Sequence, residues 1–236
     1  MITLYQFYPV LGLPNASPFC MKLETYLRMA GLSFDIHYIR NPQHGPKGKL
    51  PFIKVDDVKY ADSELIIDEL KKRFHDPLDA ELTHEQRALG RLIDYTLGDR
   101  MYWFLLYWRW QDKAGWSVIK TEYFKKLPAF SRMFVPAMVR KKVVTALKEQ
   151  GTGRYSKEEV IYLGKKIIDS LVGILGTKPY FLGDKPTSAD ATAFAFLANI
   201  LMSPLKSPLQ EYASQFESLT TYCRLMWDAY YSDFGE

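Results

Sequence analysis

The sequence is poor in cysteine and histidine, and each shortage excludes a class of protein. Its 236 residues include only two cysteines, Cys20 and Cys223, too few for the disulfide framework of a small secreted domain. The four histidines form no HExxH motif and no His-Cys cluster, so we predict no zinc site and no other metal site. The shortage of cysteine suits a reducing compartment, and we expect a cytoplasmic protein.

Long apolar runs and a surplus of one charge are missing as well. The longest strongly apolar run, residues 102–108, is far shorter than the ~20 residues that a membrane-spanning helix needs. The start of the chain lacks the basic and apolar segments of a signal peptide. Lys and Arg exceed Asp and Glu by 31 to 27, a net charge of +4 that is too small to predict a nucleic-acid partner.

Two different periodicities divide the chain. In residues 1–75, short alternating runs of β-formers are interleaved with two helical patterns, and the first helix separates two strands that we expect to be parallel. Predicted strands are residues 2–7, 33–39, 52–55 and 58–60, with a hairpin turn at Asp56-Asp57, and predicted helices follow Ser17 and span 62–74. This order predicts a thioredoxin-like α/β domain.

After a linker at residues 75–83, only helical periodicity remains. The predicted helices are residues 85–113, 129–149, 157–175, 189–202 and 216–229, separated by segments rich in glycine, proline or serine. The sequence therefore predicts an α/β domain over residues 1–75 followed by an all-helical bundle domain over residues 84–236.

The segment Ser17-Pro18-Phe19-Cys20 lies where the first loop meets the first helix. Ser17 suits the N-cap and Pro18 the first helical position, so this can be a capped helix and nothing more. A helix N-terminus also presents unpaired N–H groups and partial positive charge, which stabilise an anion such as a thiolate. The spacing is that of a CxxC redox site with serine in place of the first cysteine. Cys20, one turn further in, is expected to be a buried packing residue.

Two further junctions lie in the same domain. Pro51, after Leu50, is either a plain strand start or a cis-proline whose preceding residue offers its backbone N–H and C=O to a ligand. Asp62-Ser63 opens the second helix, either as a cap or as a carboxylate and a hydroxyl that hold an amino-acid-like end of a ligand.

In this order, the three junctions resemble the Ser-type members of the glutathione transferase superfamily. The segment from Ser17 is similar to their active-site motif, and the resemblance implies that Ser17 is the catalytic residue. Leu50-Pro51 is similar to their cis-proline, whose preceding backbone binds the cysteinyl part of glutathione. Asp62-Ser63 is similar to the acidic-Ser pair that holds the γ-glutamyl end.

The resemblance extends into the helical domain and implies the glutathione transferase fold. Thr187-Ser188-Ala189-Asp190 matches the Ser/Thr-x-x-Asp capping box of the superfamily, which we interpret as structural. Residues 12–32 are most similar to the metaxin and failed-axon-connections-like branch.

The implied function is conjugation of glutathione, a co-substrate used without a cofactor, to an apolar electrophile by a homodimer. Lowering a thiol pKa by about two units takes about 2.7 kcal/mol. A helix N-terminus contributes about 0.3–2 kcal/mol and a hydrogen bond from Ser17 to the thiolate about 1.5–3 kcal/mol, which together suffice. Two alternatives stay open: a non-catalytic glutathione-binding or scaffold protein, and a glutathione-dependent thiol reductase that uses Cys20.

An aromatic stretch at residues 102–110 either packs in the core or a dimer or lines the electrophile pocket. The candidate pocket residues are Tyr8, Tyr102, Trp103 and Tyr107. Tyr8 is also a second candidate for the hydroxyl that activates the thiol.

Two sets of basic residues are further candidates for binding. His44, Lys47 and Lys49 are candidates for contacts with the glycine end of glutathione. Between Lys120 and Lys142 there are seven basic residues and one acidic residue, which favours a solvated basic face, with an anionic partner or a membrane surface as the alternative.

Overall fold

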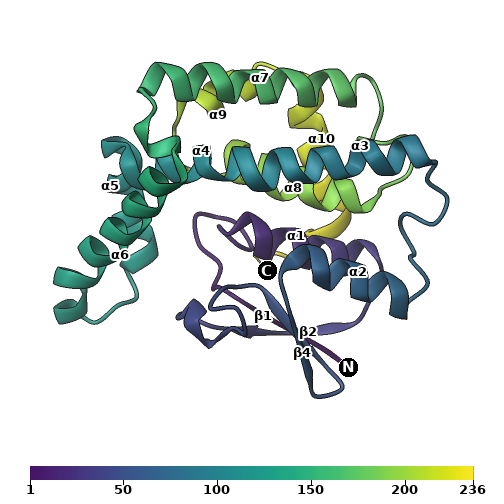
Figure 1. The fold of residues 1–236 in the computed structure, drawn as a ribbon, viewed down its shortest axis with the longest axis horizontal. Coiled ribbons are helices and arrows are strands. Elements are labelled where there is room, and N and C mark those ends of the chain that lie inside the picture. The colour runs from purple at the N-terminus through teal and green to yellow at the C-terminus, as the bar shows by residue number, and fades with distance from the viewer. Residues whose placement is uncertain (236) are drawn as a thin grey trace.

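A four-stranded mixed sheet with two helices on one face forms the first part of the chain (Figure 1). In the computed structural model, which describes residues 1–235, the strand order is β2-β1-β3-β4. The central strand β1 (Ile2–Gln6) pairs in parallel with β2 (Phe34–Tyr38) and antiparallel with β3 (Phe52–Val55), which pairs with β4 (Val58–Ala61). The predicted thioredoxin-like layout, including the parallel first pair, is confirmed.

The two helices of this domain and its tight turn also follow the predicted pattern. Helix α1 (Pro18–Met29) connects β1 to β2, and α2 (Ser63–Arg73) follows β4. Asp56 and Asp57 both have positive φ, at 50° and 67°, as a two-residue hairpin between β3 and β4 requires.

The remainder is helical, as predicted. The α-helices are α3 (His84–Tyr95), α4 (Tyr102–Leu106), α5 (Lys113–Phe124), α6 (Ala129–Gln150), α7 (Lys157–Leu175), α8 (Ser188–Leu201), α9 (Pro208–Ala213) and α10 (Glu217–Tyr230). Two π-helical segments, η2 (Thr96–Met101) and η3 (Tyr107–Gln111), flank α4, and 3-10 turns occur at η1 (Pro42–His44) and η4 (Thr152–Arg154).

Two short helices were missing from the prediction. Helix α5 begins after Asp112, whose carboxylate accepts hydrogen bonds from the amides of Ala114 (3.0 Å) and Gly115 (3.1 Å), so the long helix predicted over residues 85–113 ends there. Helix α9 begins after Ser207, with Pro208 in its first turn. In both places residues that are common in turns cap a helix, and for that reason the sequence pattern indicated a loop where a helix begins.

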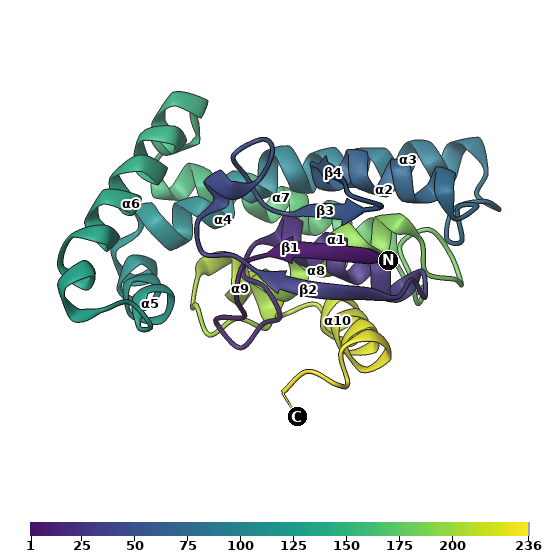
Figure 2. The same ribbon diagram turned by 90° about the horizontal axis from the view of Figure 1, so that it is seen from below.

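Helix α8 joins the two parts of the molecule. Residues 189–200 of this helix are all buried, and α1 packs against it behind the sheet as seen in Figure 2. The predicted capping box at its start is present: the Asp190 carboxylate accepts hydrogen bonds from the Thr187 amide (2.8 Å), the Thr187 hydroxyl (2.8 Å) and the Phe181 amide (2.9 Å). The box fixes the end of α8 that faces the linker.

The linker itself is anchored by one buried carboxylate. Asp79 is 5% exposed, accepts a hydrogen bond from the Ser188 amide (2.8 Å) at the start of α8, and forms an ion pair with Lys71 of α2. Burial alone would raise the pKa of Asp79, but the hydrogen bonds from Lys71 and Ser188 hold it below its ordinary value.

Asp79→Asn should lower the free energy of unfolding at pH 7 by about 1–3 kcal/mol, because charged hydrogen bonds are lost. The folded-state pKa lies below the unfolded one, so this contribution is complete above the unfolded pKa and disappears as the pH falls through the folded pKa. Urea unfolding between pH 3 and pH 7 should therefore show the two proteins converging in acid. Glu81→Gln, in an exposed pair with Lys185, is the control. A constant difference across that range would contradict the assignment.

Candidate functional site

One end of the sheet collects the three junctions that the sequence singled out. Tyr5 of β1 pairs with Phe52 of β3, which in turn pairs with Ala61 of β4. The residues just after β1, just before β3 and just after β4 therefore lie beside one another. These are the start of the loop to Ser17, the Leu50-Pro51 bond, and Asp62-Ser63.

Ser17 is held at this end by a buried asparagine. The Asn15 side chain donates a hydrogen bond to the Phe7 carbonyl (2.8 Å), at the end of β1, and accepts one from the Ser17 amide (3.0 Å). The Ser17 hydroxyl oxygen caps α1 by accepting a long hydrogen bond from the Cys20 amide (3.4 Å). Ser17 is half-buried, so a ligand at the helix start can reach both its hydroxyl and the partial positive charge of α1.

Cys20 is a packing residue, as expected. Its side chain is fully buried and packs in one cluster with Leu50 and Phe52. Burial raises the pKa of Cys20 to about 12, although hydrogen bonds with Ser17 and the Phe7 backbone act in the opposite direction. The thiol is protonated at neutral pH and out of reach of solvent, which disfavours the reductase alternative.

The Leu50-Pro51 peptide bond is cis, as its resemblance implied. Leu50 is buried, and within residues 1–235 its backbone amide and carbonyl have no hydrogen-bond partner. The loop before Leu50 closes tightly on Gly45. A side chain at this position would not fit, because its Cβ would lie 2.2 Å from the Lys49 carbonyl oxygen. Leu50 thus offers one donor and one acceptor to an extended ligand.

Asp62 has an unusual backbone, with φ 83° and ψ 122°, a conformation that costs energy for a residue with a side chain. Its exposed carboxylate accepts hydrogen bonds from the amides of Glu64 (3.1 Å) and Leu65 (3.5 Å), so it caps α2. The neighbouring Ser63 is buried at the first position of this helix. An exposed carboxylate and a buried hydroxyl therefore occur together at the start of this helix.

Tyr8 points away from this arrangement. Its ring stacks on Tyr38 at 5.1 Å, at the end of β2, and the Arg40 guanidinium lies 5.5 Å from the ring centre. Strand β2 is on the opposite side of β1 from β3, where Leu50 lies. His44, Lys47 and Lys49 are exposed in the loop before Leu50, and their role as contacts for a ligand stays a prediction.

The predicted aromatic pocket residues divide into two groups. Tyr102 packs on Phe19, in the first turn of α1, at 4.9 Å between ring centres, and Trp103 packs on Tyr102 at 5.4 Å. Tyr107 packs instead on Trp108, and its pKa is raised by burial and by the charges of Asp112 and Glu158, near the starts of α5 and α7. Tyr107 lies in the π-helical segment η3, and its place in an electrophile pocket stays a prediction.

Two side chains of the helical domain that the sequence did not reveal hold the loop before Ser17. Arg109 of η3 is 2% exposed and donates hydrogen bonds to the Ala16 carbonyl (2.6 Å) and to the Asn199 side-chain oxygen (2.7 Å). The Asn199 side-chain nitrogen donates to the carbonyls of Asn15 (3.3 Å) and Ala195 (2.8 Å). The position of Ser17 therefore depends on both domains.

The buried charge of Arg109 has no carboxylate within 4.0 Å among residues 1–235, and its Nε has no hydrogen-bond partner there. Burial raises the pKa of the Tyr102 and Tyr123 hydroxyls, and the Arg109 charge opposes this rise for both. Arg109 is a buried cation without a counter-ion and is hydrogen-bonded to the residue before Ser17, so it favours a negative charge at that site. The one feature of the sequence that pointed to this buried charge was a single arginine inside the aromatic stretch at residues 102–110.

Residues 1–235 contain no cluster of three or more His, Cys, Asp or Glu side chains that could hold a metal ion. Over the same range, no helix is long and apolar enough to cross a membrane.

Comparisons with known families match most of the chain. A model of the glutathione S-transferase N-terminal domain matches residues 18–115, and a model of the glutathione S-transferase C-terminal domain matches residues 164–226. An isoprene-epoxide–glutathione S-transferase of Rhodococcus sp. is 34% identical over 210 residues, 86% of this chain and 88% of the relative.

Two other groups of relatives are similar along nearly the whole chain. Failed axon connections of Drosophila melanogaster is 33% identical over 248 residues, covering 100% of this chain but 59% of the relative, so the chain spans less than two thirds of that protein. Metaxin-1 of Mus musculus is 26% identical over 234 residues, 95% of this chain and 74% of the relative.

Solved structures agree on the fold. The β-etherase LigF of Sphingobium sp. superposes with a TM-score of 0.65 at 16% identity, covering 96% of this chain and 94% of that one. A glutathione S-transferase of Ceriporiopsis subvermispora in complex with glutathione gives 0.62 at 16% identity, covering 97% of both chains.

Proposed function

This chain belongs to the glutathione S-transferase superfamily, and on that premise we propose that it conjugates glutathione to an apolar electrophile. The observation that carries the proposal is the strand register, which brings Ser17, Leu50 and Asp62 to one end of the sheet. The Leu50 amide and carbonyl would pair with the cysteinyl part of glutathione, and Asp62 with Ser63 would hold its γ-glutamyl end. The thiol would then lie at the start of α1.

The proposed reaction needs no cofactor. The Ser17 hydroxyl donates a hydrogen bond to the glutathione sulfur and, with the amides of α1 and the Arg109 charge, favours the thiolate over the thiol. The sulfur lone pair forms the new C–S bond while the bond from that carbon to its leaving group, or to an epoxide oxygen, breaks. The oxygen or leaving group takes the electron pair, and water supplies a proton to an epoxide oxygen.

The electrophile would lie against aromatic side chains of the helical domain. Tyr102 and Trp103 adjoin the first turn of α1 through Phe19, so an apolar molecule in contact with them would be close to the sulfur. The name of the Rhodococcus relative supports a small epoxide as the class of electrophile to try first.

Steady-state turnover of glutathione with a small epoxide and with chlorodinitrobenzene tests the proposal, alongside glutathione binding by calorimetry. We expect binding and turnover. Binding without turnover would favour the second candidate, a non-catalytic glutathione-binding or scaffold protein, which is supported by two relatives, Failed axon connections and metaxin-1, whose names describe no reaction. Absence of binding would overturn both.

Asp62→Ala should weaken glutathione binding by about 1–3 kcal/mol, because a charged hydrogen bond to the ligand is lost. Since Asp62 also caps α2, Asp62→Asn separates the two effects: it keeps a capping oxygen but removes the charge, and it should weaken binding with little loss of stability. Asp68→Asn, exposed on the same helix, is the control in calorimetry. Unchanged affinity in both Asp62 variants would remove Asp62 from the site.

By the same family membership we propose a cytoplasmic homodimer. Leu65 on α2 and Leu92 on α3 are 56% and 62% exposed, and these leucines would contact a second copy. Light scattering of the purified chain measures its molar mass, and we expect the value of a dimer.

A further inference from the structure

Helix α6 has an apolar face that no part of residues 1–235 covers. The apolar face of an amphipathic helix is normally turned to the core, but in α6 only Pro136 and Leu147 are buried. On its other side, four large apolar side chains repeat at helical spacing and are between 58% and 76% exposed. We name this set the apolar stripe; it consists of Phe130, Met133, Phe134 and Met138.

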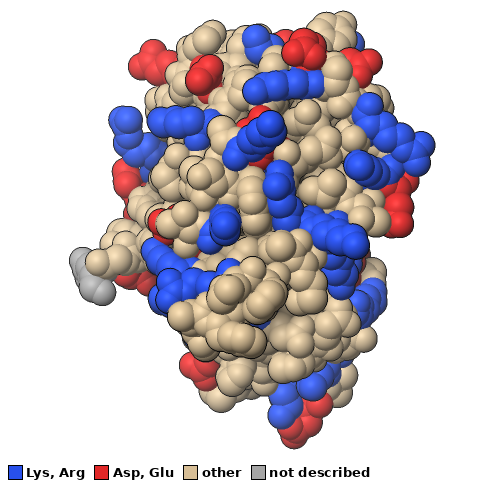
Figure 3. All heavy atoms as spheres, turned by 90° about the vertical axis from the view of Figure 1, so that its left-hand side faces the viewer, with Lys and Arg blue, Asp and Glu red and all other residues tan. Residues whose placement is uncertain are grey.

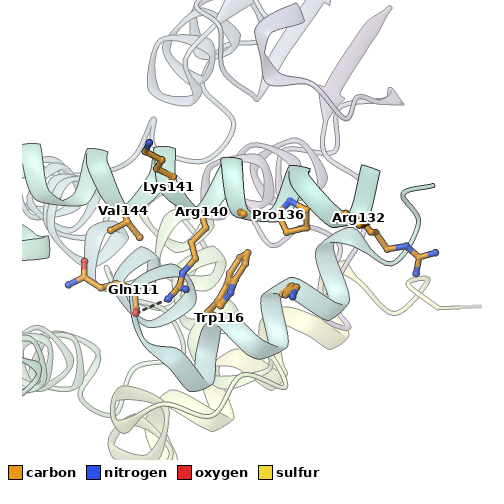
Figure 4. A pocket seen from close by; sticks show the side chains of 10 residues that line it. Gln111, Trp116, Arg132, Pro136, Arg140, Lys141 and Val144 are labelled. Atoms are coloured by element: carbon orange, nitrogen blue, oxygen red, sulfur yellow. Dashed lines mark hydrogen bonds between the residues drawn. The ribbon is translucent and has the colours of Figure 1, made fainter. Parts of the chain in front are cut away.

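Next to the stripe, α5, α6 and the residues before α5 enclose a groove of about 440 Å³ with a basic lining (Figure 4). Arg140 lies over the Trp116 ring at 5.0 Å and donates to the Trp110 carbonyl at 2.8 Å. The four cations that line the groove have no carboxylate within 4.0 Å anywhere in residues 1–235, and no acidic residue lines it. They are Lys120, Arg132, Arg140 and Lys141.

This hairpin is a distinct part of the molecule. It projects from one end of the fold (Figure 1), and that end presents many more Lys and Arg than acidic side chains around an uncharged surface (Figure 3). Most of it falls between residues 115 and 164, outside both family-domain matches. The net charge of the segment from Lys120 to Lys142 exceeds that of the whole chain, so the rest of the protein is slightly acidic.

We propose that the α5–α6 hairpin docks the protein onto the surface of an anionic phospholipid bilayer. Lipid phosphates would pair with the cations that have no counter-ion in the chain, and the apolar stripe would enter the boundary between headgroups and acyl chains. The binding is peripheral. This proposal does not depend on glutathione chemistry.

Two other occupants fit the observations less well. A second copy of this chain on the same face would bring two strongly basic surfaces together, and such like-charge contact is unfavourable. A single-stranded nucleic acid would pair with the cations and stack bases on the two phenylalanines, but it would leave the two exposed methionines without a role. An anionic bilayer satisfies both the charge and the apolar stripe.

Co-sedimentation of the full chain with vesicles tests the proposal. We expect binding to vesicles of mixed phosphatidylserine and phosphatidylcholine, about tenfold or more weaker binding to phosphatidylcholine alone, and release by ~0.5 M salt. Phe130→Ser with Phe134→Ser, and Lys141→Glu with Lys142→Glu, should each reduce partitioning by about tenfold or more.

Matched controls keep the test specific. Tyr162→Ser with Leu225→Ser removes two exposed large side chains from α7 and α10, and Lys178→Glu with Lys206→Glu makes the same charge change elsewhere. Both double variants should bind vesicles like the unaltered chain. Thermal unfolding of every variant confirms that it folds. Failure to bind anionic vesicles, or equal loss in the controls, would overturn the proposal. If vesicles are not bound, binding to a single-stranded oligonucleotide would identify a nucleic acid as the occupant. Self-association that the Phe130 and Phe134 changes abolish would identify a second copy of the chain. Either result would overturn the proposal.

Discussion

Ser17→Ala should lower the rate of glutathione conjugation at pH 7 by about ten- to a hundredfold while leaving glutathione affinity nearly unchanged. A hydrogen bond from the hydroxyl to the thiolate is worth about 1.5–3 kcal/mol, which corresponds to a rise of the bound thiol's pKa by about one to two units when it is lost. Much of the rate should return at higher pH, because the thiol can then ionise without help. The peptide ends of glutathione would be held by Leu50 and Asp62, so binding changes little.

The measurement is a pH–rate profile for Ser17→Ala beside Cys20→Ala and Tyr8→Phe. Cys20 is buried and protonated, and Tyr8 stacks on Tyr38 away from the start of α1, so neither change should shift the profile. A shift in Tyr8→Phe with none in Ser17→Ala would identify a different activating residue. A profile that no variant shifts would leave thiol ionisation to the helix start and the Arg109 charge.

Arg109→Met should be the most damaging single change near the site. It removes two hydrogen bonds to a charged group, each worth about 1.5–3 kcal/mol, and leaves the Ala16 carbonyl and the Asn199 side chain without their donor. The variant no longer has to bury a charge, which offsets part of the lost hydrogen-bond energy. We expect the free energy of unfolding to fall by about 2–4 kcal/mol. Loss of the cation should also raise the pKa of bound glutathione by about one unit.

Arg109→Lys separates the two effects, because lysine keeps the charge but cannot reach both acceptors in the same planar geometry. Urea unfolding should show a loss of stability in both variants, whereas ultraviolet absorbance of the bound thiolate, followed against pH, should shift in Arg109→Met alone. Equal thiolate titration in all three proteins would show that Arg109 only positions the loop and does not act through its charge.

Local chemistry explains why much of the fold and part of the site could be predicted from the sequence. Strand alternation, helical spacing and caps depend on residues a few positions apart, so the sheet, most helices and the roles of Ser17 and Asp62 as caps were visible. The convergence of these residues was implied only by the family resemblance, because it depends on strand register. Arg109 and Asn199 could not be found this way, since each acts on a loop more than 90 residues away.

The two helices that the sequence analysis missed have a common cause, which is that the residues typical of turns also cap helices. Helices α5 and α9 begin just after Asp112 and Ser207, which are equally typical of turns. Only the hydrogen bonds from the following amides to these side chains distinguish a helix start from a turn.

The way Leu50 presents its backbone has a consequence for how this protein can evolve. An amide and a carbonyl survive almost any change of side chain, so mutation at position 50 would leave that part of the proposed glutathione contact in place. Aromatic side chains such as Tyr102 and Trp103 have no such protection, and each substitution there alters the shape offered to the second substrate. Accumulating mutations should therefore preserve the binding of glutathione while changing which electrophiles are accepted.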